Sequence, residues 1–323
     1  MNKQSFRSFI NLTKRDIKVF YNDKASFLTS LITPFILVIL YVTFLKNVYD
    51  SSLLSVLKSF GVDGLPTVLV NGFSSGWLIS SIMATTCVTL TFCGNTIVVS
   101  DKLSGASNDI EATPVSRNII YLSYFAANFL STFFVAIIAL GLGLIYIAIV
   151  GWYLSFLDVF MIFLTTILLT LFGSFLASII MSFLHSQGGI TTWSIIISSL
   201  YGFLCGAYMP ISSFSEGLAN VIYCLPGTYG TMALRHYFSR GSLEAIEKEI
   251  SSSIGNEKAS IAVSTVKNGF DIEITAFGSK VSIGLAFIIL SSAVIVMFLL
   301  YSLIVYLESP HRKVSKGISR ANN

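Results

Sequence analysis

A single polar island, residues 101–117 (DKLSGASNDIEATPVSR), interrupts a long apolar stretch and most constrains how this chain can fold. About 28 largely apolar residues precede it and about 30 follow it. An α-helix rises about 1.5 Å per residue, so each flank is long enough to cross a lipid bilayer. We therefore expect the island to be a short loop between two membrane spans.

The composition of the whole chain supports this interpretation. Of its 323 residues, 54% are hydrophobic and 11% are charged, and the mean hydropathy is +0.79. Soluble domains carry roughly 25% charged residues. We predict an all-α integral membrane protein, surrounded by membrane lipid. The net charge of +4 does not indicate a nucleic-acid partner, because the basic residues cluster near the two ends.

Six apolar segments are long enough to span the membrane as helices. We expect the fifth to end at Pro210, and we expect one transmembrane domain over residues 1–323 with five spans between residues 27 and 210. The expected spans cover residues 27–46, 71–99, 118–149, 158–184, 190–210 and 279–307.

The segments between the spans have different characters. Residues 1–24 alternate basic and apolar side chains in a pattern typical of an amphipathic helix on the membrane surface, although a solvated basic tail has a similar composition. Residues 47–70 are polar and contain glycine and proline, which favours a loop. Residues 211–230 are apolar but short and broken, which suggests a re-entrant helical pair. Residues 231–278 are polar, and we expect a short amphipathic helix near 242–254 followed by extended chain.

Basic residues at both ends predict the orientation. The N-terminal segment and the tail at 308–323 are both rich in lysine and arginine, which favours the cytoplasmic side. An even number of spans follows, and six fits. The polar island would then face the cytoplasm, and residues 231–278 would lie outside the cell.

No expected span carries an ionisable side chain in its core, and this absence limits the possible functions. Proton-coupled carriers usually need such groups as relays. The sequence also has no G-x-x-x-x-G-K-[ST] phosphate loop, no catalytic constellation and no spacing typical of metal ligands. We therefore expect no catalytic residue, no metal and no cofactor on this chain. If it moves a substrate uphill, another polypeptide supplies the energy.

The polar island is the natural place for that energy to arrive. Residues 102–112 have the composition of a short helix, with Asp109 and Glu111 on an acidic side, and the proline of Thr113-Pro114 ends it. Arg117 then begins the third span. From the residues alone, a surface for a motor subunit and an ordinary connecting loop are both possible.

A wider pattern adds a resemblance to a known family. The order of a basic amphipathic helix, six spans and an acidic-x-x-x-Gly…Thr-Pro-Val-Ser-Arg loop resembles the permease subunits of ABC-2 type exporters. The loop match involves Asp101, Gly105, Thr113, Pro114, Val115, Ser116 and Arg117. A second match involves Tyr208-Met209-Pro210-Ile211, Leu225-Pro226-Gly227-Thr228 and Leu234-Arg235. The length of residues 231–278 departs from the minimal members.

The resemblance implies partners and a cytoplasmic site. Two permease protomers, identical or related, would form the pore in a bacterial plasma membrane, and two separate ATPase subunits would bind ATP and Mg. Residues 102–114 would sit in a cleft of each ATPase and the N-terminal helix would brace them. The coupling residues would be Asp101, Lys102, Gly105, Asp109, Glu111, Thr113, Pro114 and Arg117.

The resemblance also implies a substrate path along spans two and five. Its candidate residues are Gly72, Gly76, Gly202, Gly206, Phe203 and Tyr208. The glycines have the small-xxx-small spacing of close helix packing, which is equally compatible with contacts inside one chain. An external gate would involve Pro210, Glu216, Pro226 and Arg235, although charged residues in such regions are often simply solvated.

The cargo is only bounded by composition. With 26 phenylalanines and 14 tyrosines, an uncharged path suits hydrophobic or amphipathic cargo such as a drug, an antimicrobial peptide, a toxin or a lipid. Many of these aromatic residues are also expected at lipid or at the membrane interfaces. One alternative is a polysaccharide or teichoic-acid permease. Another is a non-transporting immunity or sensor protein that binds a toxin through residues 231–278.

Overall fold

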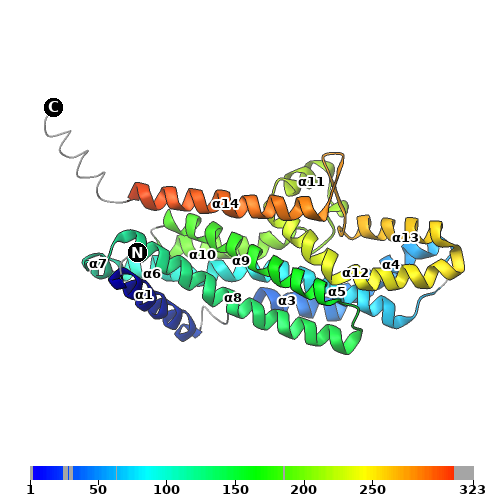
Figure 1. Ribbon diagram of the computed structural model, residues 1–323, viewed down its shortest axis with the longest axis horizontal. Helices are drawn as coiled ribbons and strands as arrows, with labels where there is room; N and C mark the ends of the chain where they lie inside the picture. Colours follow the sequence, from blue (N-terminus) through cyan, green and yellow to red (C-terminus); the bar gives the residue numbers. More distant parts are fainter. Residues whose placement is uncertain (1–2, 25–27, 29–31, 63, 185, 309–323) are drawn as a thin grey trace.

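The computed structural model describes all residues except 1–2, 25–27, 29–31, 63, 185 and 309–323. Nearly all of the described chain is helical, and the long helices run side by side along one axis (Figure 1). The helices are α1 Lys3–Asn22, α3 Ile32–Leu40, α4 Lys46–Ser59, α5 Thr67–Gly94, α6 Thr96–Ser104, α7 Ala106–Glu111, α8 Arg117–Val150, α9 Phe156–Ser182, α10 Gln187–Leu204, α11 Glu216–Tyr223, α12 Pro226–Ile254, α13 Asn256–Gly269 and α14 Ile283–Glu308.

Four short elements complete the described fold. A π-helix, Tyr41–Leu45, joins α3 to α4, and a 3₁₀ turn, Ile211–Ser213, follows α10. Two three-residue strands, β1 Ile274–Ala276 and β2 Ser279–Val281, form an antiparallel hairpin in which Ala276 pairs with Ser279.

Four helical stretches are long and apolar enough to cross a membrane: α5 with α6, α8, α9 and α14. They confirm an all-α membrane architecture. The third and fourth expected spans, 118–149 and 158–184, match α8 and α9 to within two residues. A capping box starts α9, because the Ser155 hydroxyl accepts the Asp158 N–H while the Asp158 carboxylate accepts the Ser155 N–H.

The first expected span continues further than predicted, and the loop predicted at 47–70 is wrong over its first part. The chain stays helical from Ile32 to Ser59 through α3, the π-helix and α4; residues 27 and 29–31 lie outside the described part. The polar composition of α4 hides a buried stripe, since Tyr49, Leu53 and Leu57 recur every four residues and pack inward.

The fifth expected span ends earlier than predicted, and its end does not depend on Pro210. The last helical residue of α10 is Leu204. Gly206 has φ +70°, and the N–H of Ala207 reaches back to the Gly202 carbonyl at 2.8 Å, which is the Schellman pattern that stops a helix. With 18 residues, α10 is shorter than the four candidate spans. A total of six spans stays a prediction.

The region from 211 to 278 also differs from expectation. The predicted pair of half-helices at 211–230 is one short helix, α11, and then the start of α12, which continues as a single helix to Ile254. The extended chain expected after 254 is largely the helix α13. Gly230 and Gly241 do not break α12, because both are close-packing positions: a Cβ there would meet the Leu169 side chain and the Tyr153 carbonyl.

The core has a larger part among the long helices and a smaller part at the α13 end of the bundle. The larger cluster joins α5, α8, α9, α10 and α12, while a second cluster joins α4, the first half of α5, the end of α12 and α13. Helix α5 is central to both and is buried on nearly all sides. Helix α14 has the opposite character, since only 11% of its apolar window is buried, so most of its surface is available to lipid.

Gly76 offers a test of the packing between α5 and α12. A Cβ at Gly76 would lie 2.5 Å from the backbone carbonyl oxygen of Phe238, which cannot rotate away. We expect Gly76→Ala to lower the free energy of unfolding by about 1–3 kcal/mol, as overpacking does. The matched control is Gly141→Ala in α8, where nothing lies within 4 Å. Thermal unfolding in one detergent measures both, and equal midpoints would contradict this packing.

Candidate functional site

A large cavity of about 1290 Å³ lies between the continuous helical stretch from α3 to α4 and helix α10. Its walls also include parts of α5 and α6 and the segment that follows α10. Apolar side chains such as Leu45 and Ile195 make much of the lining. Hydroxyl groups are distributed among them, from Ser52, Thr96, Ser100, Ser194, Ser198, Ser199 and Ser213.

Aromatic and charged residues occupy different places on the cavity wall. Tyr49, Phe203, Tyr208 and Phe270 contribute rings, while Asp23 is the only charged side chain in the lining that the structure describes. Apolar walls with a few well-placed polar groups are typical of sites for small molecules. The cavity can therefore hold a large amphipathic molecule without any catalytic chemistry.

The segment after α10 borders one end of this cavity, and four polar contacts fix its position. The Tyr49 hydroxyl donates to the Tyr208 carbonyl at 3.0 Å. The Ser212 hydroxyl donates to the Gly269 carbonyl at 3.3 Å, and the Ile211 N–H donates to the Asp271 carboxylate. Arg235 donates to the Gly206 carbonyl. These contacts hold the segment against α4, α12 and the end of α13.

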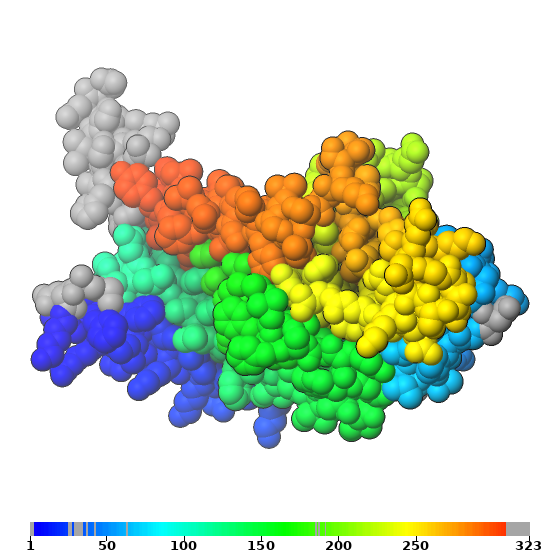
Figure 2. Space-filling view, turned by 45° about the vertical axis from the view of Figure 1, so that its right-hand side comes forward, coloured from blue at the N-terminus to red at the C-terminus, as the bar shows by residue number. Residues whose placement is uncertain are grey.

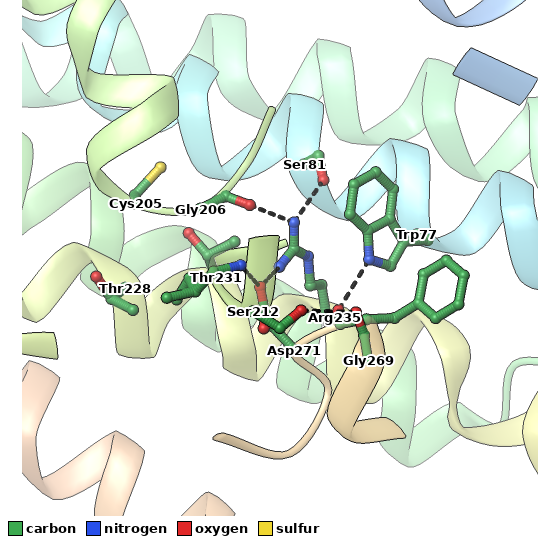
Figure 3. Close-up of polar contacts among 12 residues, drawn as sticks. Trp77, Ser81, Cys205, Gly206, Ser212, Thr228, Thr231, Arg235, Gly269 and Asp271 are labelled. Carbon is green, nitrogen blue, oxygen red and sulfur yellow. Dashed lines mark hydrogen bonds and ion pairs between the residues drawn. The ribbon is translucent and has the colours of Figure 1, made fainter. Parts of the chain in front are cut away.

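Arg235 is the centre of this network (Figure 3). Its side chain is only 1% exposed, forms a 3.1 Å ion pair with Asp271 and lies 4.3 Å from the ring centre of Trp77. The Trp77 indole in turn donates to the Phe270 carbonyl at 3.0 Å. Asp271 has φ +53°, a strained value for a residue with a side chain, and its two acceptor contacts hold it there.

A second polar network lies at the other end of the bundle, where α1 meets α6 and α8. Arg15 holds both carboxylate oxygens of Asp101, one of them at 2.9 Å, and the Tyr124 hydroxyl donates to Asp101 at 2.7 Å. The Asp101 hydrogen bond raises the pKa of Arg15. Asp101 is therefore buried in a contact between helices and is not a free surface carboxylate.

The predicted coupling helix at 102–112 is interrupted, so the expectation of one continuous helix is wrong. Helix α6 ends at Ser104, Gly105 adopts φ +84°, and α7 covers only Ala106–Glu111. Only glycine adopts this left-handed backbone without strain. The chain bends sharply at Gly105 and presents α7 at the end of the bundle (Figure 1).

The remaining island residues divide into tethered and exposed ones. Lys102 donates to the Ser182 carbonyl at 3.3 Å, and Glu111 pairs with Arg117. Exposed side chains belong to Leu103, Ser104, Asn108, Asp109, Ala112, Thr113, Pro114 and Ser116.

The candidate path glycines make close contacts within this chain. A Cβ at Gly72 would meet the Tyr153 ring, one at Gly76 the Phe238 carbonyl, and one at Gly202 the Tyr208 ring. Gly206 provides the turn after α10. All four glycines thus make a close contact or a turn within this chain, while Phe203 and Tyr208 line the cavity.

The candidate gate residues are not equivalent. Pro210 lines the cavity, Glu216 is exposed at the start of α11, and Pro226 is the first residue of α12. Arg235 is buried and paired, so the solvated alternative is wrong for this residue.

Sequence reasoning missed the partners of both networks. The sequence does mark Arg235 as unusual, because it is a lone arginine inside the apolar run TMALRHYF. No local pattern marks Asp271, Trp77 or Arg15, since each lies at least 36 positions in the chain from the residue that it contacts. In the described residues no group of three histidine, cysteine or acidic side chains could hold a metal ion.

Removing the charge of Asp271 tests the buried pair. Asp271→Asn suits the left-handed backbone but leaves Arg235 without a carboxylate, which should cost about 3–5 kcal/mol of unfolding free energy. Adding Arg235→Met to this variant removes the unpaired charge and should recover most of the loss. Unfolding in detergent measures both. Equal stability of the single and double variants would show that the charge pair does not matter.

Asp16 predicts a pH dependence at the α1 contact. Burial raises its pKa from 3.8 to about 6, against the opposing effect of Arg15, while Asp101 and Tyr124 face it from α6 and α8. Because the pKa of Asp16 is raised in the folded protein, its contribution to the free energy of unfolding is fully present below about pH 4. This contribution, up to about 3 kcal/mol, is lost as the pH rises through about 6. Asp16→Asn should abolish this fall between pH 4 and 7 in thermal unfolding. A variant with an unchanged pH profile would contradict the assignment.

Comparison with known proteins gives the family. The family model for the ABC-2 type transporter matches residues 7–238, more than two thirds of the chain. Searches of curated proteins and of solved structures returned no match. The matched range starts within α1, includes the polar island and Arg235, and ends within α12, before α13, the hairpin and α14. This chain belongs to the ABC-2 type transporter family, whose members are membrane permeases that pair with an ABC ATPase subunit.

Proposed function

We propose that this chain is the permease of an ABC exporter that moves hydrophobic or amphipathic cargo out of a bacterial cell. The observation that carries the proposal is the 1290 Å³ cavity between α3–α4 and α10. Drug-sized ligands usually occupy sites of roughly 300–1,000 Å³, so the cavity has room for a drug, a short peptide or a lipid. Transport of the cargo needs no chemistry from the lining residues.

The lining favours amphipathic cargo over a glycan. A sugar polymer presents many hydroxyl groups, each of which loses a partner when it leaves water. The lining offers hydroxyl side chains, one charged group among the residues that the structure describes, and a largely apolar wall. The four rings on the wall keep a polysaccharide or teichoic-acid substrate as the alternative, since rings also stack on sugars.

The proposed site is completed by a second copy of the chain or a related protomer. Helices α3 and α10 border the cavity, and α3, the π-helix and α10 carry exposed apolar residues that do not line it, among them Phe35, Phe44 and Leu200. Two such faces would bury each other across the pore. In this arrangement the protein lies in the plasma membrane, and both termini and the island face the cytoplasm.

Energy would enter through the exposed part of the island. The proposed contact for each of two ATPase subunits, which would hold ATP and Mg, comprises α7 and the exposed residues Asp109, Thr113 and Pro114. Helix α1 braces this surface through Arg15 and Asp101. From there α5 and α6 run as one stretch, Thr67–Ser104, to Trp77 beside Arg235. We infer that movement of α7 reaches the segment bordering the cavity along this stretch.

The cavity is tested by filling it. We expect Ser198→Trp to reduce cargo transport and cargo-stimulated ATP hydrolysis several-fold, because the indole would occupy part of the cavity. Inside-out vesicles containing the co-expressed ATPase measure both quantities, with amphipathic dyes and lipid-linked glycans as competing cargoes. Ser252→Trp, at an exposed position near the end of α12, is the matched control. Unchanged transport by Ser198→Trp would refute the cavity, and stimulation by glycans alone would select the alternative cargo.

The coupling surface is tested by charge reversal. Asp109→Arg should reduce co-purification of the ATPase subunit and abolish most cargo-stimulated hydrolysis, because Asp109 is exposed on α7. Glu249→Arg makes the same change at an exposed position of α12 near the opposite end and should behave like the unaltered protein. If both variants retain the ATPase equally, the island is an ordinary connecting loop.

A further inference from the structure

The turn of the β1–β2 hairpin holds a residue that does not suit its backbone. Phe277 and Gly278 join the two strands, with φ values of +51° and +78°. Two-residue hairpin turns with both φ values positive favour asparagine, aspartate or glycine, and a bulky residue there is strained. Phenylalanine at this position is therefore unfavourable for the isolated hairpin.

Phe277 gains little from the protein in return. Its side chain is 64% exposed, and its ring contact is with Tyr223 at the end of α11, at 6.2 Å between centroids. Exposed apolar side chains continue along α11 at Leu218 and Val221. We call Leu218, Val221, Tyr223 and Phe277 the apolar ridge. Figure 2 shows the hairpin and α11 standing out together from the surface beside the start of α14.

The apolar ridge has a firm base. Under it, Ile222 of α11, Ile274 and Val281 of the hairpin and Ala286 of α14 form a small buried cluster with residues of α12. The ridge therefore keeps its place relative to α14, and the side chains on it are presented outward rather than folded back.

Its place relative to α14 indicates what the ridge contacts. Helix α14 begins at Ile283, two residues after the hairpin, and its first turns expose Leu285 and Ile288. This helix is a candidate membrane span with most of its surface open to lipid. The ridge projects sideways at the end of α14 nearest α13 (Figure 1), so it continues the lipid-facing surface at the level where that span leaves the membrane.

The chemistry of the ridge fits the boundary between lipid headgroups and acyl chains. Aromatic side chains are enriched at that depth, and an amphipathic helix lies there with its apolar side inward. Lys280, exposed on β2, is long enough to reach headgroups while the ridge contacts acyl chains.

We propose that the apolar ridge inserts into the membrane leaflet at the α13 end of the bundle, which is the outer leaflet in the orientation proposed above. Lipid contact offsets the backbone strain at Phe277 and anchors α11 and the start of α14 at one depth. This surface is separate from the cargo cavity, whose lining includes none of the four ridge residues.

Site-specific photo-crosslinking tests the proposal. Benzoylphenylalanine is placed at position 277 in the full chain with its ATPase partner, in nanodiscs of phosphatidylethanolamine and phosphatidylglycerol. Position 288 on α14 is the lipid-facing reference. Position 261 is the control, because Ile261 is also an exposed apolar residue (49%) but lies on α13, which is not among the candidate membrane spans. We expect lipid adducts at 277 to approach those at 288 and to exceed those at 261 several-fold. Yields at 277 no higher than at 261, or crosslinks to a second copy in place of lipid, would overturn the proposal.

A second variant separates lipid contact from folding. Phe277→Asn suits the left-handed backbone, so the hairpin should form and the melting temperature in detergent should be equal or higher. With the crosslinker at position 218, this variant should show a several-fold loss of lipid adduct relative to the chain with Phe277. An unchanged adduct at 218 would show that Phe277 does not anchor the ridge. None of these measurements requires transport, so a failed cargo assay and a failed lipid contact are distinguishable.

Discussion

The buried charge of Arg235 is the constraint on which the half of the structure nearest α13 depends. A guanidinium removed from water must find a carboxylate, and its remaining donors need acceptors. The two terminal nitrogens of Arg235 find acceptors in Asp271 and the Gly206 carbonyl, and Trp77 covers the guanidinium. The end of α13, the turn after α10 and the middle of α5 must therefore meet at one point of α12.

This meeting point explains why the cavity has a defined border after α10. The chain between α10 and α11 packs into the core through Ala207 and Ile211, and its carbonyl and N–H groups are held by Arg235, Asp271 and Tyr49. Tyr49 belongs to α4 and Arg235 to α12, while Asp271 follows the end of α13. Any relative movement of these segments must rearrange the contacts that border the cavity, and the network of Arg15 and Asp101 lies at the other end of the same α5–α6 stretch.

Sequence patterns predicted the parts of the fold that depend on local composition. Apolar length was sufficient for α8 and α9, and the N-terminal pattern was sufficient for α1, because a helix satisfies its own backbone inside a membrane. Glycine was the main source of error. Gly206 and Gly105 end helices by adopting a left-handed backbone. Gly230 and Gly241 lie inside α12, at positions where a neighbouring residue leaves no room for a side chain. The distinction depends on distant residues that no local pattern reveals. For the site, the island and Arg235 were recognisable, but Asp271 and Trp77 were not.

The two strained positions of the described chain illustrate how far such reasoning extends. Asp271 and Phe277 are the non-glycine residues with positive φ among the residues that the structure describes. At Asp271 the compensation is visible, because its carboxylate binds Arg235 and the Ile211 N–H. At Phe277 the ring contacts Tyr223, while 64% of the side chain is exposed near the start of α14. Because strain persists only where surroundings offset it, the lipid contact proposed for the apolar ridge would add to the compensation that the paired strands of the hairpin give Phe277.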